Sequence, residues 1–103
     1  MEVEVEIGAL AEGESRSVRL GYGRYVLVSR VDGALRAIDD VCNHGGCKLS
    51  EGAREGRNVV CPCHALAFDV SDGRLVTPHP DATDQRTYPV LGDGARVRLV
   101  LPG

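Results

Sequence analysis

The sequence predicts an all-β protein made of many short antiparallel strands. Apolar and polar residues alternate in several short segments, Asp-Gly pairs separate some of these segments, and no segment keeps an apolar helical stripe for three turns. The chain has 103 residues, which is the usual size of one domain. A core of this size gains stability from a covalent or metal cross-link.

Four strands are expected in the amino-terminal part of the chain. Valine and isoleucine alternate with glutamate over 2–7, and a second strand is expected near 15–20. The segments 24–31 and 34–39 flank Asp32-Gly33, a pair typical of a two-residue type I′ turn, because glycine adopts positive φ at low cost. This is the clearest hairpin in the sequence.

Further strands are expected in the carboxy-terminal part. Segments 67–70 and 74–76 are joined around Asp72-Gly73, and 87–91 is expected to pair with 96–100 across Asp93-Gly94. Pro89 has no N–H to donate, so it should lie at a sheet edge.

Two short motifs lie between these strand-rich halves. They are Cys42-Asn43-His44-Gly45-Gly46-Cys47 and Cys61-Pro62-Cys63-His64, and they hold all four cysteines and two of the three histidines. Thiolate and imidazole are both metal ligands. The motifs therefore predict a metal site built from two loops. We expect one domain, with a base at about 1–39 and 80–103 and a cluster-binding subdomain inserted at about 40–79.

Cys-x-His followed at this distance by Cys-x-x-His resembles the Rieske [2Fe-2S] proteins, in which two cysteines bind one iron and two histidines bind the other. The segments Phe68-Asp69-x-x-x-Asp72-Gly73, Pro78 and Thr87-Tyr88-Pro89-Val90 extend this resemblance over nearly the whole chain. It implies one Rieske-type [2Fe-2S] cluster and a Rieske-type fold, in which an antiparallel sandwich or barrel carries the cluster subdomain. The implied iron ligands are Cys42, His44, Cys61 and His64.

Structural zinc is the main alternative for the metal, because zinc also accepts two cysteine and two histidine ligands. Zinc fingers usually place both cysteines in one turn and both histidines on a following helix. Here each motif carries one of each, which favours two irons. An iron and sulfide analysis that found only zinc would establish the alternative.

The resemblance also implies a disulfide between Cys47 and Cys63. Rieske proteins that resemble the quinol-oxidising subunit have cysteines at both places, and the bond joins the two cluster loops. Two reduced, buried thiols are the alternative. Disulfides are usual in oxidising compartments, yet the amino terminus has no signal-peptide pattern. No apolar stretch is long enough for a membrane span. We expect a cytoplasmic protein whose disulfide is sheltered beside the cluster; the alternative is a chain from which a membrane anchor was removed.

The residues that follow His64 differ from those of the quinol-oxidising subclass. In that subclass a serine and a tyrosine donate hydroxyl hydrogen bonds to cluster sulfurs, whereas this chain has Ala65, Leu66 and Phe68 in this region. Hydrogen bonds to sulfur stabilise the reduced cluster. Without them, the reduction potential should lie toward the roughly −150 mV end of the Rieske range.

Backbone groups are then the remaining expected donors to sulfur. We expect them to come from Gly45, Gly46 and the second loop. Pro78, by resemblance, belongs to the loop that covers the cluster.

The implied function is that of a Rieske-type ferredoxin. Such a protein carries single electrons from a flavin- or NAD(P)H-linked reductase to a terminal oxygenase or similar acceptor, and it is not itself an enzyme. A small electron-transfer subunit of a nitrite, arsenite or quinol oxidoreductase is the second hypothesis, and a zinc-stabilised binding module is the third. The net charge of −3 and the lack of a basic block argue against a nucleic-acid partner.

Two surface features allow two interpretations. His79 lies between two prolines and is either solvated surface or a partner contact. The first fourteen residues contain five glutamates and no basic residue. They are either the solvated face of a strand or a docking site for a basic reductase.

Overall fold

The computed structural model of the chain describes residues 1–21, 23–43 and 46–102. Its strands form three antiparallel sheets, with the orders β1-β10-β9, β2-β3-β4-β8 and β5-β6-β7. The elements are β1 (Glu2–Glu6), β2 (Ser15–Gly21), β3 (Arg24–Val31), β4 (Ala34–Asp39), the 3₁₀ helix η1 (Leu49–Glu51), β5 (Ala53–Glu55), β6 (Asn58–Val60), β7 (Ala67–Asp69), β8 (Thr87–Tyr88), β9 (Val90–Leu91) and β10 (Arg96–Val100). The predicted all-β class is confirmed.

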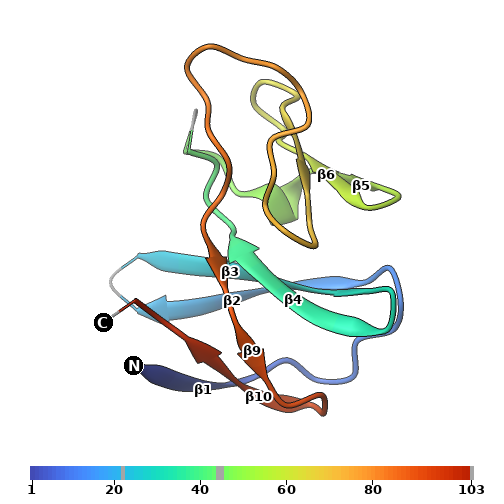
Figure 1. The fold of residues 1–103 in the computed structure, drawn as a ribbon, viewed down its shortest axis with the longest axis vertical. Coiled ribbons are helices and arrows are strands. Elements are labelled where there is room, and N and C mark those ends of the chain that lie inside the picture. Colours follow the sequence, from blue (N-terminus) through green and yellow to red (C-terminus); the bar gives the residue numbers. More distant parts are fainter. Residues whose placement is uncertain (22, 44–45, 103) are drawn as a thin grey trace.

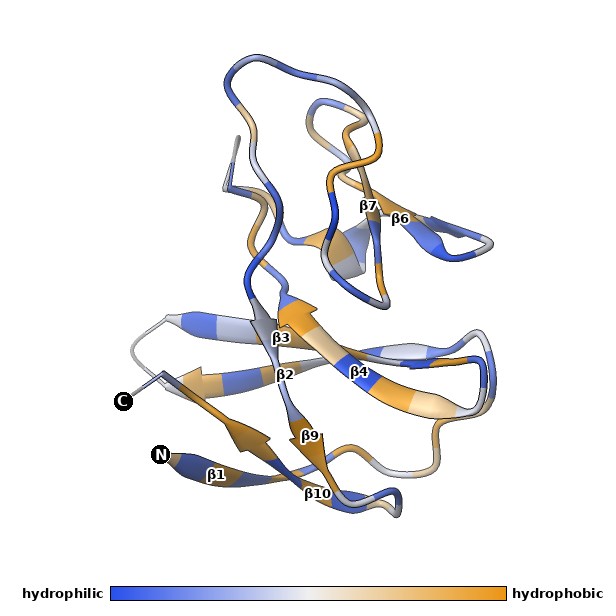
Figure 2. Ribbon diagram, in the orientation of Figure 1, coloured by the Kyte–Doolittle hydropathy of each residue, from blue (hydrophilic) through white to orange (hydrophobic). Residues whose placement is uncertain are grey.

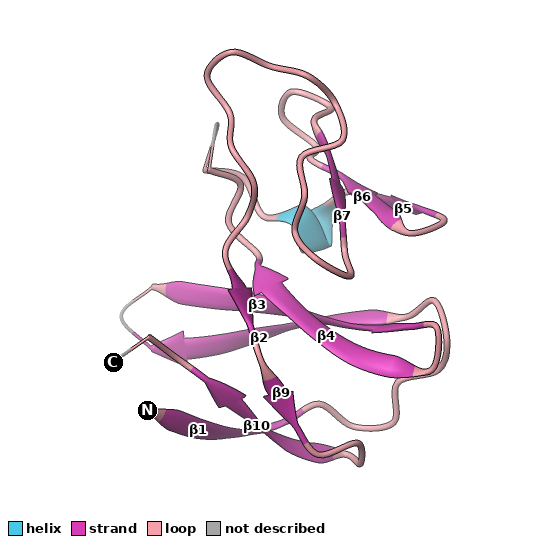
Figure 3. Ribbon diagram, in the orientation of Figure 1, coloured by secondary structure: helices cyan, strands magenta, loops and turns pink. Residues whose placement is uncertain are grey.

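The first two sheets face each other and form the lower half of the molecule (Figures 1 and 3). Their facing side chains make one apolar core, which includes Val5, Val26, Val28, Tyr88 and Leu99. Strand β1 shows how the sequence pattern produces this packing. Val5 is buried, whereas Glu2, Glu4 and Glu6 are exposed, as expected for side chains that alternate between the two faces of a strand.

The third sheet and η1 lie above this sandwich, together with the long loop that leads to β8 (Figure 1). A second apolar core, the upper core, joins this half to strands β3 and β4. It includes Leu49, Val59, Leu66, Phe68 and Val70 of the upper half and Leu27, Val31 and Ile38 of the two strands. Figure 2 shows apolar segments in both halves. The third sheet supports the division expected from the sequence, and we propose that the inserted subdomain spans about 40–79.

The strongest hairpin prediction is confirmed. Strands β3 and β4 pair in the expected register, from Val31 opposite Ala34 to Val26 opposite Asp39. Both turn residues have positive φ, 52° at Asp32 and 80° at Gly33, as a type I′ turn requires. Glu12 holds the turn from outside, because its carboxylate accepts the N–H groups of Asp32 and Gly33 at 2.7 and 2.8 Å.

Two strand predictions were wrong. Residues 74–76 form no strand and contribute only an isolated bridge from Leu75 to Phe68. The segment 87–91 is not one strand, because it divides at Pro89. Strand β8 pairs with β4, and β9 pairs with β10 in the opposite sheet.

The sequence analysis did not predict the hairpin of β5 and β6. Its turn contains Gly56, which has a φ of 61°.

Proline accounts for the division of 87–91, because it has no N–H to continue a ladder. Both β8 and β9 are outermost in their sheets, so the expectation of an edge position for Pro89 is confirmed.

The acidic strand β1 faces arginines of β10. Glu6 forms an ion pair with Arg96 at 3.2 Å, and Glu2 forms one with Arg98 at 3.6 Å. These pairs neutralise part of the acidic surface, which favours the interpretation of a solvated strand face.

In the described part of the chain, no helix is long and apolar enough to cross a membrane.

Candidate metal centre

Two of the predicted ligands are thiols buried in the upper core. Cys42 is 2% exposed and Cys61 is 1% exposed, and neither takes part in a disulfide. Cys61 directly follows β6, and Cys42 follows β4 after two residues, so the ends of two strands position them. His64 is exposed at the surface of the second loop. His44 and Gly45 lie outside the described residues.

The two cysteine loops close with the same pattern of backbone hydrogen bonds. In the first, Cys42 N–H donates to Cys47 O at 2.7 Å, and Gly46 N–H donates to Cys42 O at 3.0 Å. In the second, Cys61 N–H donates to Leu66 O at 2.8 Å, and Ala65 N–H donates to Cys61 O at 2.9 Å. Each loop therefore begins at a buried cysteine and returns to it.

This closure changes one expectation from the sequence. The Gly46 N–H was expected to donate to a cluster sulfur, but in the structure it donates to the carbonyl of Cys42. The Ala65 N–H is engaged in the same way. It stays a prediction that other backbone N–H groups donate hydrogen bonds to the cluster sulfurs.

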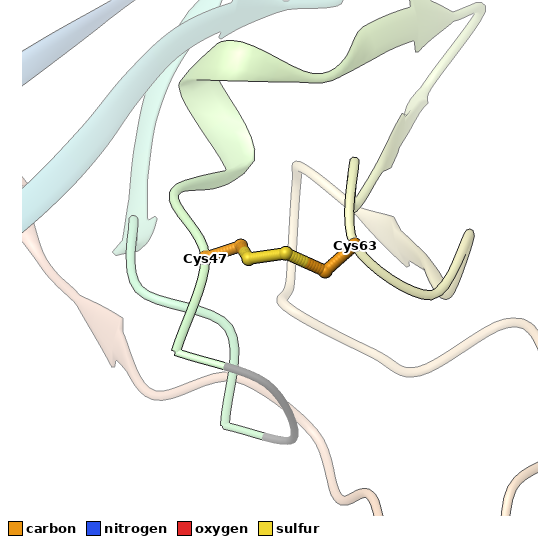
Figure 4. Close-up of a disulfide and its surroundings, with 2 residues drawn as sticks. All are labelled: Cys47 and Cys63. Carbon is orange, nitrogen blue, oxygen red and sulfur yellow. A yellow bond between two sulfur atoms is a disulfide. The ribbon is translucent and has the colours of Figure 1, made fainter.

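Cys47 and Cys63 form a disulfide between the two loops (Figure 4). Their Cα atoms are 6.2 Å apart, which is within the range of protein disulfides. The predicted bond is confirmed, and the alternative of two reduced thiols is wrong for this structure. Cys47 is half-buried but Cys63 is exposed, so burial does not shelter the bond on the side of the second loop.

The region that lacks hydroxyl donors is buried and apolar. Leu66 and Phe68 both lie in the upper core with Cys42 and Cys61. Neither side chain can donate a hydrogen bond to sulfur. Pro78 is exposed in the loop that precedes β8, and its role over the cluster stays a prediction.

Asp40 is a buried residue of this region that sequence reasoning missed. Its carboxylate is 0% exposed and accepts hydrogen bonds from Ser17 Oγ, Ser50 N–H and Ser50 Oγ, each at 2.7 Å. These donors satisfy the carboxylate, and they tie the end of β4 to β2 and to η1. Because Ser17 and Ser50 are both distant from Asp40 in the sequence, no local sequence pattern predicts these hydrogen bonds.

The hydroxyl of Tyr88 donates a hydrogen bond to the carboxylate of Asp39, which is distant in the sequence. Burial, followed by the hydrogen bond and the negative charge of Asp39, raises the pKa of Tyr88 to about 12, against the opposing positive charges of Arg24 and Arg86. Asp69, at the end of β7, shows the opposite balance. Burial raises its pKa, but hydrogen bonds from Ser71 and the charges of Arg57 and Arg74 outweigh this effect and lower the pKa overall.

The donor set fits an iron–sulfur cluster. Two thiols held in an apolar core can deprotonate to bind iron out of contact with water, and an exposed imidazole adds a nitrogen ligand near the surface. Among the residues that the structure describes, no three His, Cys, Asp or Glu side chains are gathered as if around one metal ion.

Comparisons with known proteins agree with this chemistry. The family model of the Rieske [2Fe-2S] domain matches residues 3–89. A ferredoxin component of naphthalene 1,2-dioxygenase/salicylate 5-hydroxylase systems from a Ralstonia species is 36% identical over 90 residues, which cover 87% of this chain and 85% of the relative. A ferredoxin component of the naphthalene 1,2-dioxygenase system of Pseudomonas aeruginosa is 35% identical over 97 residues, which cover 94% of this chain and 91% of the relative.

Solved structures show the same relationship. The Sphingomonas yanoikuyae B1 ferredoxin matches with a TM-score of 0.77 and 28% identity, covering 94% of both chains. A chain from a complex of reduced oxygenase and oxidised ferredoxin of carbazole 1,9a-dioxygenase matches with a TM-score of 0.79 and 27% identity, covering 94% of this chain and 92% of that chain. These matches replace the zinc alternative with a Rieske-type [2Fe-2S] cluster. The chain belongs to the Rieske [2Fe-2S] domain family, as an electron carrier rather than an enzyme.

Proposed function

We propose that Cys42, His44, Cys61 and His64 are the iron ligands. We further propose that the chain carries single electrons from a flavin- or NAD(P)H-linked reductase to a terminal oxygenase or a similar redox protein. The observation that carries the proposal is the pair of matching loops, each of which begins at a buried cysteine that forms no disulfide. A cluster held between such loops has its cysteine side in the core and its histidine side toward the surface.

The chain itself contributes burial, position and a surface. The bound cluster supplies one-electron redox chemistry, and neutral imidazoles in place of two thiolates raise its potential above that of all-cysteine clusters. The upper core excludes water from Cys42 and Cys61. His64 is exposed, so a partner protein could approach the cluster from that side.

The proposed acceptor rests on the relatives. The two relatives described above are named as ferredoxin components of dioxygenase systems. One of the matching structures is a complex of a ferredoxin with an oxygenase. We propose the same class of acceptor for this chain. A cytoplasmic location follows from the proposed reductase, because that enzyme would draw on cytoplasmic NAD(P)H.

The ligand set can be tested with two histidine variants. His64→Ala should lose most of the bound iron and acid-labile sulfide, whereas the matched control His79→Ala should keep both. Equal iron content in the two variants would rule out His64 as a ligand. Reduction of the wild-type protein by a purified flavin reductase with NADH, followed by reoxidation with a Rieske-type oxygenase, then tests the carrier function.

The disulfide favours a second candidate function. A bond between the two cluster loops is the feature of this chain that resembles the quinol-oxidising subclass. It supports a dedicated electron-transfer subunit of a larger oxidoreductase. Such a subunit should purify from its native source together with a large catalytic chain, whereas a ferredoxin should purify alone.

A further inference from the structure

Gln85 is a buried polar residue beside the first cluster loop. Only 4% of it is exposed, and it lies directly before Arg86 and β8, at the end of the long loop of the upper half. A buried amide is costly unless its donors and acceptor are all paired. The partners of Gln85 therefore indicate what it does.

The side-chain amide of Gln85 binds the backbone that leads into the cluster loop. Its Nε2 donates to Asp39 O at 2.9 Å and to Val41 O at 2.8 Å. Its Oε1 accepts from Asn43 N–H at 3.1 Å. The orientation of the amide follows from these partners, because carbonyl oxygens only accept and an N–H only donates.

These bonds continue the ladder between β4 and β8. The two strands pair Ala37 with Tyr88 and Ile38 with Thr87, and Asp39 N–H still donates to Arg86 O at 2.9 Å. Beyond that point the side chain of Gln85 replaces the backbone of a neighbouring strand. It binds the chain at Asp39, at Val41 and, one residue past Cys42, at Asn43.

Asn43 returns the contact from the other side. Its Nδ2 donates to Gln85 Oε1 and to Thr83 O, both at 2.6 Å, and its Oδ1 accepts from Thr83 N–H at 3.0 Å. The amide of each loop thus binds the backbone of the other loop. The two side chains fasten the segment before β8 to the loop that holds the first cysteine.

Gly73 fixes the backbone of Gln85 from a third segment. Gln85 N–H donates to Gly73 O at 2.8 Å, and a Cβ on Gly73 would lie 2.5 Å from Gln85 O. Only glycine allows this approach. Gln85 is therefore held at its backbone and at its side chain, which is what a rigid support requires.

We propose that Gln85 is a positioning residue for the cluster: through Asn43 it sets the geometry of the loop between the proposed ligands Cys42 and His44. The inference rests on the proposed ligand set. Groups that orient metal ligands typically change metal affinity by about 10- to 100-fold when they are removed. Gln85 should therefore affect retention of the cluster and its spectrum, as well as stability.

The test uses the purified protein with its cluster and the variant Gln85→Met, which keeps side-chain length but has no amide. Bleaching of the visible absorbance under a chelator should become about tenfold faster, and the g-values of the reduced protein in electron paramagnetic resonance should shift. Ser29→Ala is the matched control, because it removes a buried hydrogen bond, to Ser15 at 2.7 Å, within the base sheet. The control should lower stability without changing the g-values.

A second variant covers the case in which Gln85→Met does not fold. Asn43→Ala, at an exposed position, removes the bond between the two side chains together with the two bonds to Thr83, and should also bleach faster than the wild type. The double variant should bleach more slowly than the sum of the two single effects predicts, because both single variants remove the bond between the two side chains.

The outcomes separate this inference from the proposed ligand set. Suppose that Asn43→Ala, and Gln85→Met where it folds, lose their visible absorbance at the rate of the control and have unchanged g-values. The positioning role is then wrong, while the ligand set stands. If the wild-type protein itself shows no Rieske spectrum, the ligand set fails first.

Discussion

Gly46 and Ala65 occupy equivalent positions in the two cluster loops. Their φ angles are 74° and 57°, and each donates its N–H to the carbonyl of the buried cysteine that begins its loop. The two loops therefore close in the same way although their Cys-x-His and Cys-x-x-His motifs differ. In both loops the fifth residue adopts the left-handed conformation, which favours glycine.

Ala65→Gly should therefore stabilise the protein. An L-residue in the left-handed region costs about 1–2 kcal/mol, and the extra freedom of glycine in the unfolded chain offsets part of the gain. We expect the free energy of unfolding in urea to rise by about 0.5–1 kcal/mol. Gly46→Ala is the inverse control. Apart from its chain neighbours, its Cβ would meet no atom of the described residues within 4 Å, so the expected loss is a backbone effect. A lower stability for Ala65→Gly would show that the strain is absent.

Loss of the disulfide should matter most in the protein without its cluster. The bond joins residues 16 positions apart, and closing a loop of that length stabilises a protein by about 3 kcal/mol in the chain-entropy model. The cluster would join nearly the same loops. The double variant Cys47→Ser, Cys63→Ser should thus lower the unfolding free energy by up to about 3 kcal/mol without the cluster and by clearly less with it. Equal losses in the two forms would contradict this account.

Local turn chemistry made much of the fold predictable. The Asp32-Gly33 turn gave β3 and β4 their observed bounds, because a two-residue turn fixes strand register. The strands of 53–60 were missed because they are short and their turn at Gly56 lacks a neighbouring Asn or Asp. The division of 87–91 was missed because Tyr88 and Val90 join different sheets, and this pairing depends on tertiary packing rather than on the local sequence.

The site also has features that the sequence predicted and features that it did not. The cysteine motifs predicted the two loops, because ligands and their spacing lie close together in the sequence, and the resemblance to Rieske proteins implied the disulfide. Asp40 and Gln85 could not be recognised, because their partners lie in distant segments and a single Asp or Gln has no pattern. The sequence does not predict the bond from Gly46 N–H to Cys42 O, because that bond depends on how the backbone of the loop closes in space.

Stability should depend on alkaline pH through Tyr88. Its pKa is about 12 when folded and 10 for an ordinary tyrosine, so folding favours the protonated hydroxyl. This contribution is complete below pH 10 and is lost as the pH rises toward 12. At about 1.4 kcal/mol per pKa unit, the loss is at most about 3 kcal/mol. Urea unfolding from pH 8 to 11 should show a decline in the wild type that is absent in Tyr88→Phe. Parallel curves for the two proteins would exclude Tyr88 as its source.

The low potential should follow from the apolar side chains at Leu66 and Phe68. Both lie in the core that contains Cys42 and Cys61, where a hydroxyl would be shielded from water and its hydrogen bond to sulfur would be strong. The wild-type potential near neutral pH should lie toward roughly −150 mV, and Leu66→Ser with Phe68→Tyr should raise it.

Potentiometric titration of the visible absorbance measures both values. Leu66→Ala is the control for the space that serine leaves, because it removes the same apolar contacts without adding a donor. A rise in the double variant but not in Leu66→Ala assigns the effect to the hydroxyls. An unchanged potential in the double variant, or a wild-type value near the +300 mV end of the range, would show that backbone donors or the cluster's charge surroundings set the potential instead.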